Sequence, residues 1–329
     1  MKTVIPIFSA LCLVLCVQVL NAANFSSFAT GNWNAAGTWT LTSGMDVDGI
    51  PDADDNVTIS FNHIITLDIA PTIASLTMLS NSLITGANSF TISGNTTISG
   101  AALSPDGAVS IGGALAWENG DIGVLTSASV FDVTVGGTVT ITHIGLAYGH
   151  GLIRRKLIIN GGCNWTDGSL TFGGGAIFEV PIGQTFTYNQ TTGFTISNID
   201  AQSGTLDIKG TLLKQGNFSL GINNVTVINS GAINVTGGTL NIFPTNYSGN
   251  GSISCSTGAT FNNNYSGGLN YSNAAFTNNG TYSGSALIFN GSTQQTLAGT
   301  GTIANLTLNN ANNLNITGTQ TISDRKSVV

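Results

Sequence analysis

The sequence predicts an all-β protein, most of which is a parallel β-helix (a β-solenoid) with an N-terminal cap module. Apolar residues alternate with Ser, Thr and Asn at a period of two, and Gly or Asn separates one run from the next. This pattern is typical of short strands with one buried face. Equivalent strands recur at Ile92, Ile111, Val135 and Ile159, with gaps of 19, 24 and 24 residues. Self-similarity at this period indicates stacked coils.

A later recurrence, from Ile288 to Leu308 with a gap of 20 residues, fits the same scheme. Leucine-rich repeats have a similar period but need a Leu and Asn framework that this sequence lacks. A β-helix needs only short strands, corners that Gly permits, and inward side chains that stack on the next coil. About 12 coils at a spacing of about 4.8 Å would give a rod about 60 Å long. A β-sandwich built from hairpins is the alternative.

Residues 1–23 have the composition of a secretory signal peptide. Lys2 supplies the positive charge, residues 4–20 are mostly apolar, and small residues precede the expected cleavage point. A transmembrane anchor is the alternative, but the apolar run is short for one and is interrupted by Pro6 and Gln18. We therefore expect a secreted protein located at the cell surface, with no transmembrane segment in the mature chain.

The mature chain divides into two parts of different composition. Residues 24–72 contain Trp33 and Trp39 followed by an acid-rich stretch, whereas residues 73–323 carry the strand repeats. A solenoid needs a terminal module that shields the open core of its first coil. We expect residues 24–72 to be that cap. Runs of Asn in the repeats, such as residues 262–264, predict stacked amide ladders at the corners of the coils.

Charge is scarce and unevenly distributed. Charged residues make up 7% of the chain, the net charge is −7, and residues 215–323 contain no Asp, Glu, Lys, Arg or His. General acid–base catalysis and metal binding both depend on such groups. This third of the chain is therefore expected to hold shape, stack or adhere. The acidic balance also argues against nucleic acid and anionic membranes as partners.

Residues 324–329 differ abruptly from the uncharged stretch before them. They carry Asp324, Arg325 and Lys326, and they match one reading frame of a common sequencing-adapter oligonucleotide. We expect this hexapeptide to be non-native and the natural chain to continue past residue 323. A natural polar tail is the alternative.

Four segments resemble parts of a known group of proteins. Residues 31–39 (GNWNAAGTW), 49–59 (GIPDADDNVTI) and 63–68 (HIITLD) resemble a leader module of large secreted surface proteins of Bacteroidetes that carry a type IX secretion sorting domain at the C-terminus. Residues 294–301 (QQTLAGTG) resemble their solenoid repeats. The resemblance implies export to the cell surface and roles such as adhesion, with surface polysaccharide or other cell-surface proteins as partners. The sorting domain itself is absent from this sequence.

An acidic cluster follows the second tryptophan. Five carboxylates lie within ten residues, with Gly49 and Pro51 between them, and they are Asp46, Asp48, Asp52, Asp54 and Asp55. Ca²⁺ takes six to eight oxygen ligands, and an Asp-x-Asp-Gly loop can bring several together. The run resembles the calcium-binding aspartate repeats of thrombospondin type 3 modules. We expect a calcium site here; a solvated acidic loop is the alternative.

The leading interpretation of function is a non-catalytic structural or adhesive protein of the cell surface that contacts glycans. The rival is a carbohydrate-active β-helix enzyme, a polysaccharide lyase or hydrolase. Its candidate residues would be Arg155 in the basic patch, together with acids of nearby coils, which are Asp121, Asp132, Asp167 and Glu179. Such a site needs two acids held at matching positions, and the spacing of these residues fixes no such pair.

The two cysteines of the mature chain are predicted not to form a disulfide. Cys163 and Cys255 lie about four coils apart at the inferred period, or roughly 20 Å along the axis. A disulfide requires a Cα separation of about 4.4–6.8 Å. Mass spectrometry of the folded protein without reductant should find both thiols unpaired. A crosslink between them would contradict the solenoid.

Overall fold

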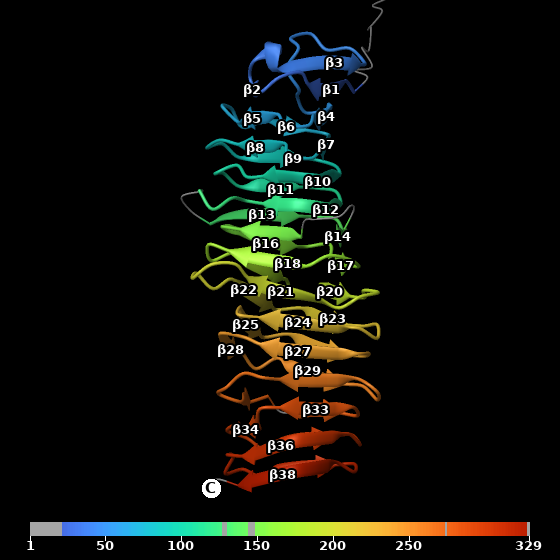
Figure 1. The fold of residues 1–329 in the computed structure, drawn as a ribbon, viewed down its shortest axis with the longest axis vertical. Helices are drawn as coiled ribbons and strands as arrows, with labels where there is room; N and C mark the ends of the chain where they lie inside the picture. Colours follow the sequence, from blue (N-terminus) through green and yellow to red (C-terminus); the bar gives the residue numbers. More distant parts are fainter. Residues whose placement is uncertain (1–21, 127–129, 144–148, 274, 328–329) are drawn as a thin grey trace, which may run out of the picture.

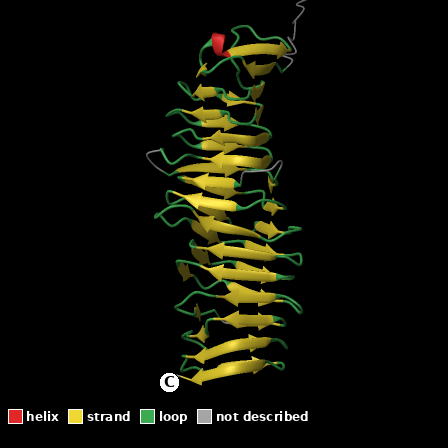
Figure 2. Ribbon diagram, in the orientation of Figure 1, coloured by secondary structure: helices red, strands yellow, loops and turns green. Residues whose placement is uncertain are grey.

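The structure is a computed structural model and describes residues 22–126, 130–143, 149–273 and 275–327. Within these residues the regular secondary structure is β-strand, joined by turns, apart from a single-turn 3-10 helix, η1 (Ala36–Thr38). The chain winds into a rod of about 12 stacked turns, with its first strands at one end and its last at the other (Figures 1 and 2). The prediction of an all-β parallel β-solenoid is confirmed. The expected signal peptide, residues 1–23, lies outside the described residues except for its last two positions.

Strands of successive turns pair in parallel and line the rod on three sides, named here face 1, face 2 and face 3. By hydrogen bonding the described strands form two sheets, of 29 and 9 strands, because some strands continue from one face to the next. Face 1 contains β1 (Asn24–Ser27), β4 (Asn56–Ile59), β7 (Ser75–Met78), the first part of β10 (Thr96–Leu103) and of β12 (Leu115–Ile122), β14 (Val139–Ile141), β17 (Cys163–Trp165), β20 (Thr185–Tyr188), β23 (Thr211–Lys214), β26 (Ala232–Val235), β29 (Ser252–Cys255), β32 (Ala275–Asn278), β35 (Gln295–Ala298) and β37 (Leu314–Thr317).

Face 2 is formed by the strands that come next in each turn. It contains β2 (Gly31–Asn32), β5 (Ile64–Thr66), β8 (Leu83–Thr85), the second part of β10 and of β12, β15 (His150–Ile153), β18 (Leu170–Gly173), β21 (Phe194–Asn198), β24 (Ser219–Asn223), β27 (Thr239–Phe243), β30 (Thr260–Asn263), β33 (Thr281–Gly284), and the first part of β36 (Thr302–Leu308) and of β38 (Thr321–Ser327).

Face 3 closes each turn. It contains β6 (Thr72–Ile73), β9 (Phe90–Ile92), β11 (Val109–Ile111), β13 (Phe131–Val135), β16 (Arg155–Ile159), β19 (Ile177–Val180), β22 (Thr205–Ile208), β25 (Thr226–Asn229) and β28 (Asn246–Ser248), and further along the rod β31 (Leu269–Tyr271), β34 (Leu287–Phe289) and the second part of β36 and of β38.

The observed register confirms the first predicted recurrence and corrects the second. Ile92 pairs with Ile111, Ile111 with Val135, and Val135 with Ile159, all on face 3. The later pair was wrong by one residue, because Leu308 pairs with Phe289 and not with Ile288. Phe289 is fully buried. A shift of one residue would turn its ring outward, since side chains of a strand alternate between the two sides.

The core is a set of inward columns in which side chains of successive turns lie on one another. One column on face 1 runs in register through Trp117, Ile141, Trp165, Tyr188 and Lys214, all of which are fully buried. The Trp165 and Tyr188 rings lie edge to face with centroids 5.1 Å apart. Burial of apolar surface in these columns is the main stabilising contribution, at roughly 25 cal/mol per Å².

The cysteines occupy the positions that the sequence predicts. Cys163 lies on β17 and Cys255 on β29, and three strands of face 1, β20, β23 and β26, separate them. Both thiols are buried and free. The separation of four coils and the absence of a disulfide between these two residues are confirmed.

In the predicted run 262–264, the amide of Asn262 stacks on a strand and not at a corner. Asn262 of β30 donates its Nδ2 to Oδ1 of Asn241 on β27, at 2.8 Å. Ser283 of β33 continues the column by donating to Oδ1 of Asn262, at 3.1 Å. These side chains point outward from face 2, so their hydrogen bonds lie on the surface. The backbone hydrogen bonds between strands hold the coils together.

The N-terminal residues combine parallel and antiparallel pairing. β3 (Trp39–Ser43) runs antiparallel to β1, and β1 and β2 pair in parallel with β4 and β5 of the first turn (Figure 1). Trp33 is fully buried, with its ring 4.8 Å from that of Trp39 and 5.2 Å from that of Phe90. That residues 24–72 act as a cap remains a prediction.

The C-terminal residues continue the solenoid. Asp324, Arg325 and Lys326 belong to β38 and pair with Asn305, Leu306 and Thr307 of β36. Strand pairing uses backbone groups that every residue except Pro provides. The pairing therefore does not bear on the origin of residues 324–329, and their non-native character remains a prediction.

Lys214 is an unusual member of its column. Its fully buried ammonium donates to the carbonyl oxygens of Gln215 (2.7 Å), Gly216 (3.1 Å) and Gly237 (2.8 Å), and lies 5.2 Å from the centroid of the Tyr188 ring. Burial lowers the pKa of Lys214 to about 8. The unfolded chain keeps this proton up to about pH 10.4.

We expect this difference to make part of the stability depend on pH. From about pH 8 to about pH 10 the unfolded chain holds more protons at Lys214 than the folded chain, so this residue's contribution to the free energy of unfolding rises with pH. Denaturant unfolding gives the free energy of unfolding of wild type and of Lys214→Met at both pH values. The stability of wild type relative to the variant should be greater at the higher pH. A difference independent of pH would contradict the lowered pKa.

Candidate functional site

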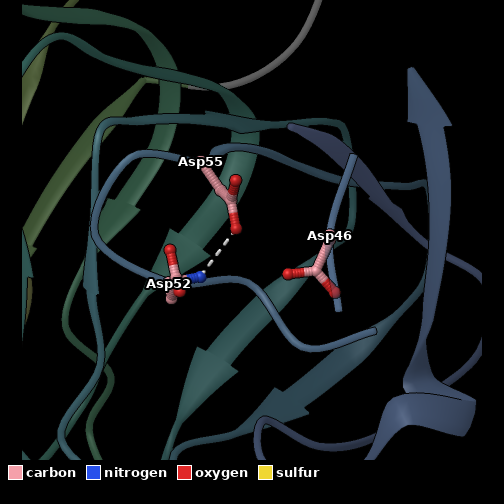
Figure 3. Close-up of side chains that lie close together, drawn as sticks. All are labelled: Asp46, Asp52 and Asp55. Carbon is pink, nitrogen blue, oxygen red and sulfur yellow. Dashed lines mark hydrogen bonds between the residues drawn. The ribbon is translucent and has the colours of Figure 1, made fainter. Parts of the chain in front are cut away.

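Three of the five aspartates of the acidic cluster come together. One carboxylate oxygen from each of Asp46, Asp52 and Asp55 lies within 4.8 Å of the others (Figure 3). They lie in the loop between β3 and β4, where Gly49 adopts a positive φ of 75° that lets the chain turn back. The other two expected ligands, Asp48 and Asp54, are exposed and do not belong to this group.

Hydrogen bonds within the loop already use several of these oxygens. Asp55 is 4% exposed and accepts from the backbone N–H of Ala23 and of Asp52, at 2.9 Å each. Burial raises the pKa of Asp55, and the two N–H bonds act in the opposite direction. Asp46 accepts from the N–H of Gly49. The main role of the Asp55 carboxylate is therefore structural, because it accepts hydrogen bonds that connect the loop to residue 23.

The chemistry of the donors fits a calcium ion, but the three carboxylates supply only part of the number of ligands that this ion takes. Three carboxylates supply hard oxygen ligands and negative charge, which Ca²⁺ prefers. Backbone carbonyls and water would have to complete the six to eight oxygens that this ion takes. The geometry thus selects Asp46, Asp52 and Asp55 from the five predicted ligands.

The residues of the rival catalytic interpretation are not brought together. Arg155 is fully buried and donates to the carbonyl oxygens of Arg154 (2.7 Å) and Pro105 (2.6 Å), with Asp106 at 3.6 Å. Its guanidinium therefore stabilises the interior of the rod through hydrogen bonds to backbone carbonyl groups. Asp121 projects from face 2 and Asp132 from face 3, whereas Asp167 lies in the turn between β17 and β18.

Glu179 takes part in ion pairs on face 3. Its Oε2 lies 2.9 Å from Nζ of Lys156 and 2.8 Å from Nζ of Lys209. Burial alone would raise the pKa of Glu179, but the bonds from Lys209 and Lys156 lower it overall. An ionised, doubly paired carboxylate has the character of a structural contact between coils.

Sequence reasoning missed a trough on face 2, referred to below as the face 2 trough. It has a volume of about 490 Å³ and crosses the strands β8, β10, β12, β15 and β18. Five outward positions in register run along it, one per strand, and these are Leu83, Ala102, Asp121, Gly151 and Thr171. The side chains at the centre of this row are small. Asp121 is the one carboxylate among the residues that line the trough.

Glycines create the trough. β10 and β12 pass from face 1 to face 2 without an intervening loop, bending at Gly100 (φ 70°) and Gly120 (φ 89°). A Cβ at Gly120 would lie 2.2 Å from the carbonyl oxygen of Ala101, so only Gly fits. These two coils therefore lack the projecting turn that a longer corner would make.

Gly151 controls the position of the Asp121 carboxylate. A Cβ at Gly151 would lie 2.2 Å from Oδ1 of Asp121, and the Gly151 N–H donates to this side chain. Burial raises the pKa of Asp121, and the Gly151 bond opposes this shift. Nearby, Ser82 is 2% exposed, lines the trough, and its hydroxyl has no hydrogen-bond partner among the described residues. The Ser82 hydroxyl oxygen is itself buried, so the trough offers the Asp121 carboxylate as an acceptor between small apolar walls.

Comparisons with known proteins give no further assignment. No protein-family model matches the chain, and the searches of curated proteins and of solved structures likewise find no match. Among the described residues, no helix has the length and apolar character needed to cross a membrane.

Proposed function

We propose that this protein is a secreted β-solenoid of the cell surface with a structural and adhesive role, and that it binds glycans along face 2 without cleaving them. The observation that carries the proposal is the face 2 trough, an open depression that runs along the axis across five strands. A depression of this form suits a linear polymer better than a compact ligand. The likeness of residues 31–39 and 49–59 to secreted Bacteroidetes surface proteins supports the location.

The chemistry of the trough suits hydroxyl-rich ligands. An ionised carboxylate such as that of Asp121 accepts hydrogen bonds from two ligand hydroxyls, and charge-assisted bonds of this kind are the stronger ones. Asn81 and Thr171 add further polar groups at the two ends of the trough. Small residues between them let a sugar ring approach the backbone.

A non-catalytic role fits the distribution of acids. Glycoside hydrolysis uses two carboxyl groups about 5 Å or about 6.5–9.5 Å apart, and Asp121 is the single acid among the residues that line the trough. The rival enzyme function keeps one observation in its favour, which is the raised pKa of Asp121 within a depression.

The trough makes a specific prediction about binding. The wild-type chain should bind a soluble polysaccharide in affinity electrophoresis, and Asp121→Asn should weaken binding about tenfold, which corresponds to about 1.4 kcal/mol. Gly151→Ala should act similarly, because its Cβ displaces the Asp121 carboxylate. Asp132→Asn, on face 3, is the matched control and should bind as wild type.

The same samples distinguish binding from catalysis. Each polysaccharide is assayed for new reducing ends and for unsaturated products after incubation with the protein. Turnover that Asp121→Asn abolishes would establish the enzyme and overturn the adhesive role. Equal binding by wild type and both trough variants would remove the trough from the binding site.

We further propose that Asp46, Asp52 and Asp55 bind Ca²⁺ and tie the N-terminal loop to the first turn. Calorimetry should detect calcium binding by wild type, and calcium should raise the melting temperature. Asp46→Asn should remove both effects, because it deletes one of the three charges, whereas the exposed Asp48→Asn should retain them. The absence of binding heat together with an unchanged melting temperature in wild type would refute the site.

A further inference from the structure

A second binding feature lies further along face 2. Phe243, the last residue of β27, is 45% exposed and projects outward from the face. In register beside it are Asn223 of β24 and, one coil further, Ser197 of β21. An aromatic ring held at this exposure among amide and hydroxyl groups is available to a ligand.

Two hollows flank the ring of Phe243. One, of about 310 Å³, has Gly221 at its centre, with Phe194 and Thr195 on one side and Asn241 and Phe243 on the other. The other, of about 470 Å³, lies between Phe243 and Asn223. None of the residues that line either hollow is charged.

Gly221 keeps the first hollow open. It occupies the outward column in which its neighbours are Thr195 and Asn241. A Cβ there would lie 3.1 Å from Cγ2 of Thr195, and a larger side chain would fill the space between the two phenylalanines. The side-chain oxygen Oδ1 of Asn241 accepts a hydrogen bond from Nδ2 of Asn262, which orients the Asn241 amide group.

Building on the proposed function, we propose that Phe243, Asn223 and Asn241 form a subsite for an uncharged sugar unit of a neutral polysaccharide. The ring of Phe243 offers an apolar surface to the C–H face of a pyranose, in the way that aromatic side chains pack against apolar faces. The amides of Asn223 and Asn241 offer both donors and acceptors to the hydroxyls at the rim of the sugar. The uncharged lining selects neutral sugars, because an acidic sugar would lose hydration there without gaining a counter-charge.

The position of the subsite relative to the trough defines a longer binding path. The trough ends at Thr171 on β18, and β21 with Phe194 is the next strand of face 2. Asp121 and Phe243 belong to one outward column in register, and five coil steps, or about 24 Å, separate them. One linear glycan lying parallel to the axis would therefore contact Asp121 and Phe243 together.

The test compares two phenylalanines of similar exposure. Phe243→Ala should weaken binding of a neutral polysaccharide, such as a soluble glucan or mannan, about tenfold in affinity electrophoresis. Gly221→Thr, which fills the hollow, should act in the same direction. Phe218→Ala is the matched control, because Phe218 is 47% exposed but lines neither hollow, and it should bind as wild type. Circular dichroism and melting temperature confirm that each variant is folded.

The outcomes test the proposed subsite at Phe243 separately from the proposed binding in the trough. Binding that Asp121→Asn weakens and Phe243→Ala leaves unchanged keeps the proposed function and overturns the subsite. Wild type that binds only acidic polysaccharides, such as polygalacturonate, also overturns it. Self-association that Phe243→Ala abolishes, measured by analytical ultracentrifugation, would assign this face to a contact between copies instead. Failure of wild type to bind any polysaccharide would end both proposals.

Discussion

The structure depends on one constraint, the in-register parallel pairing of each coil with the coils before and after it. In a strand on any face, backbone N–H and C=O groups bond to neighbouring turns, so a shift of one residue would break alternation on that face. Coils of different length satisfy the constraint by taking up the difference in their turns. The coil from Phe186 to Leu212 is longer than the one from Val57 to Leu76, yet both keep strand register.

The corners between strands impose a second requirement. Their backbone carbonyl groups are not paired with a neighbouring strand and still need hydrogen-bond donors. Long polar side chains reach these carbonyls from the interior. Lys214 donates to three of them, Arg155 to two, and Gln295 to those of Tyr271 and Asn273. This explains how a rod with a continuous apolar core accommodates buried cations. It also explains why the arginine most suggestive of catalysis in the sequence has a structural role.

The outward positions are free of both requirements, and the candidate ligand-binding features are found there. A depression appears on face 2 where Gly100 and Gly120 allow two coils to turn without a loop, and a hollow appears where Gly221 interrupts a column of larger residues. Function on such a scaffold depends on local departures from a regular surface. Substitution at these positions can therefore alter a binding site and leave the coil register intact.

The sequence by itself determined the class of fold and much of the register. Ile92, Ile111, Val135 and Ile159 are one column because alternation and spacing are local properties, and the separation of Cys163 from Cys255 follows from the same period. The acidic cluster was also visible, although only the fold selected three of its members. Tertiary structure alone decided which coil corners are short, which of two adjacent residues faces inward at Phe289, and that Asp121 lies in a depression beside Gly151. These features depend on which outward residues of different coils become neighbours, and that pairing is set by turn lengths whose conformations the periodicity does not encode.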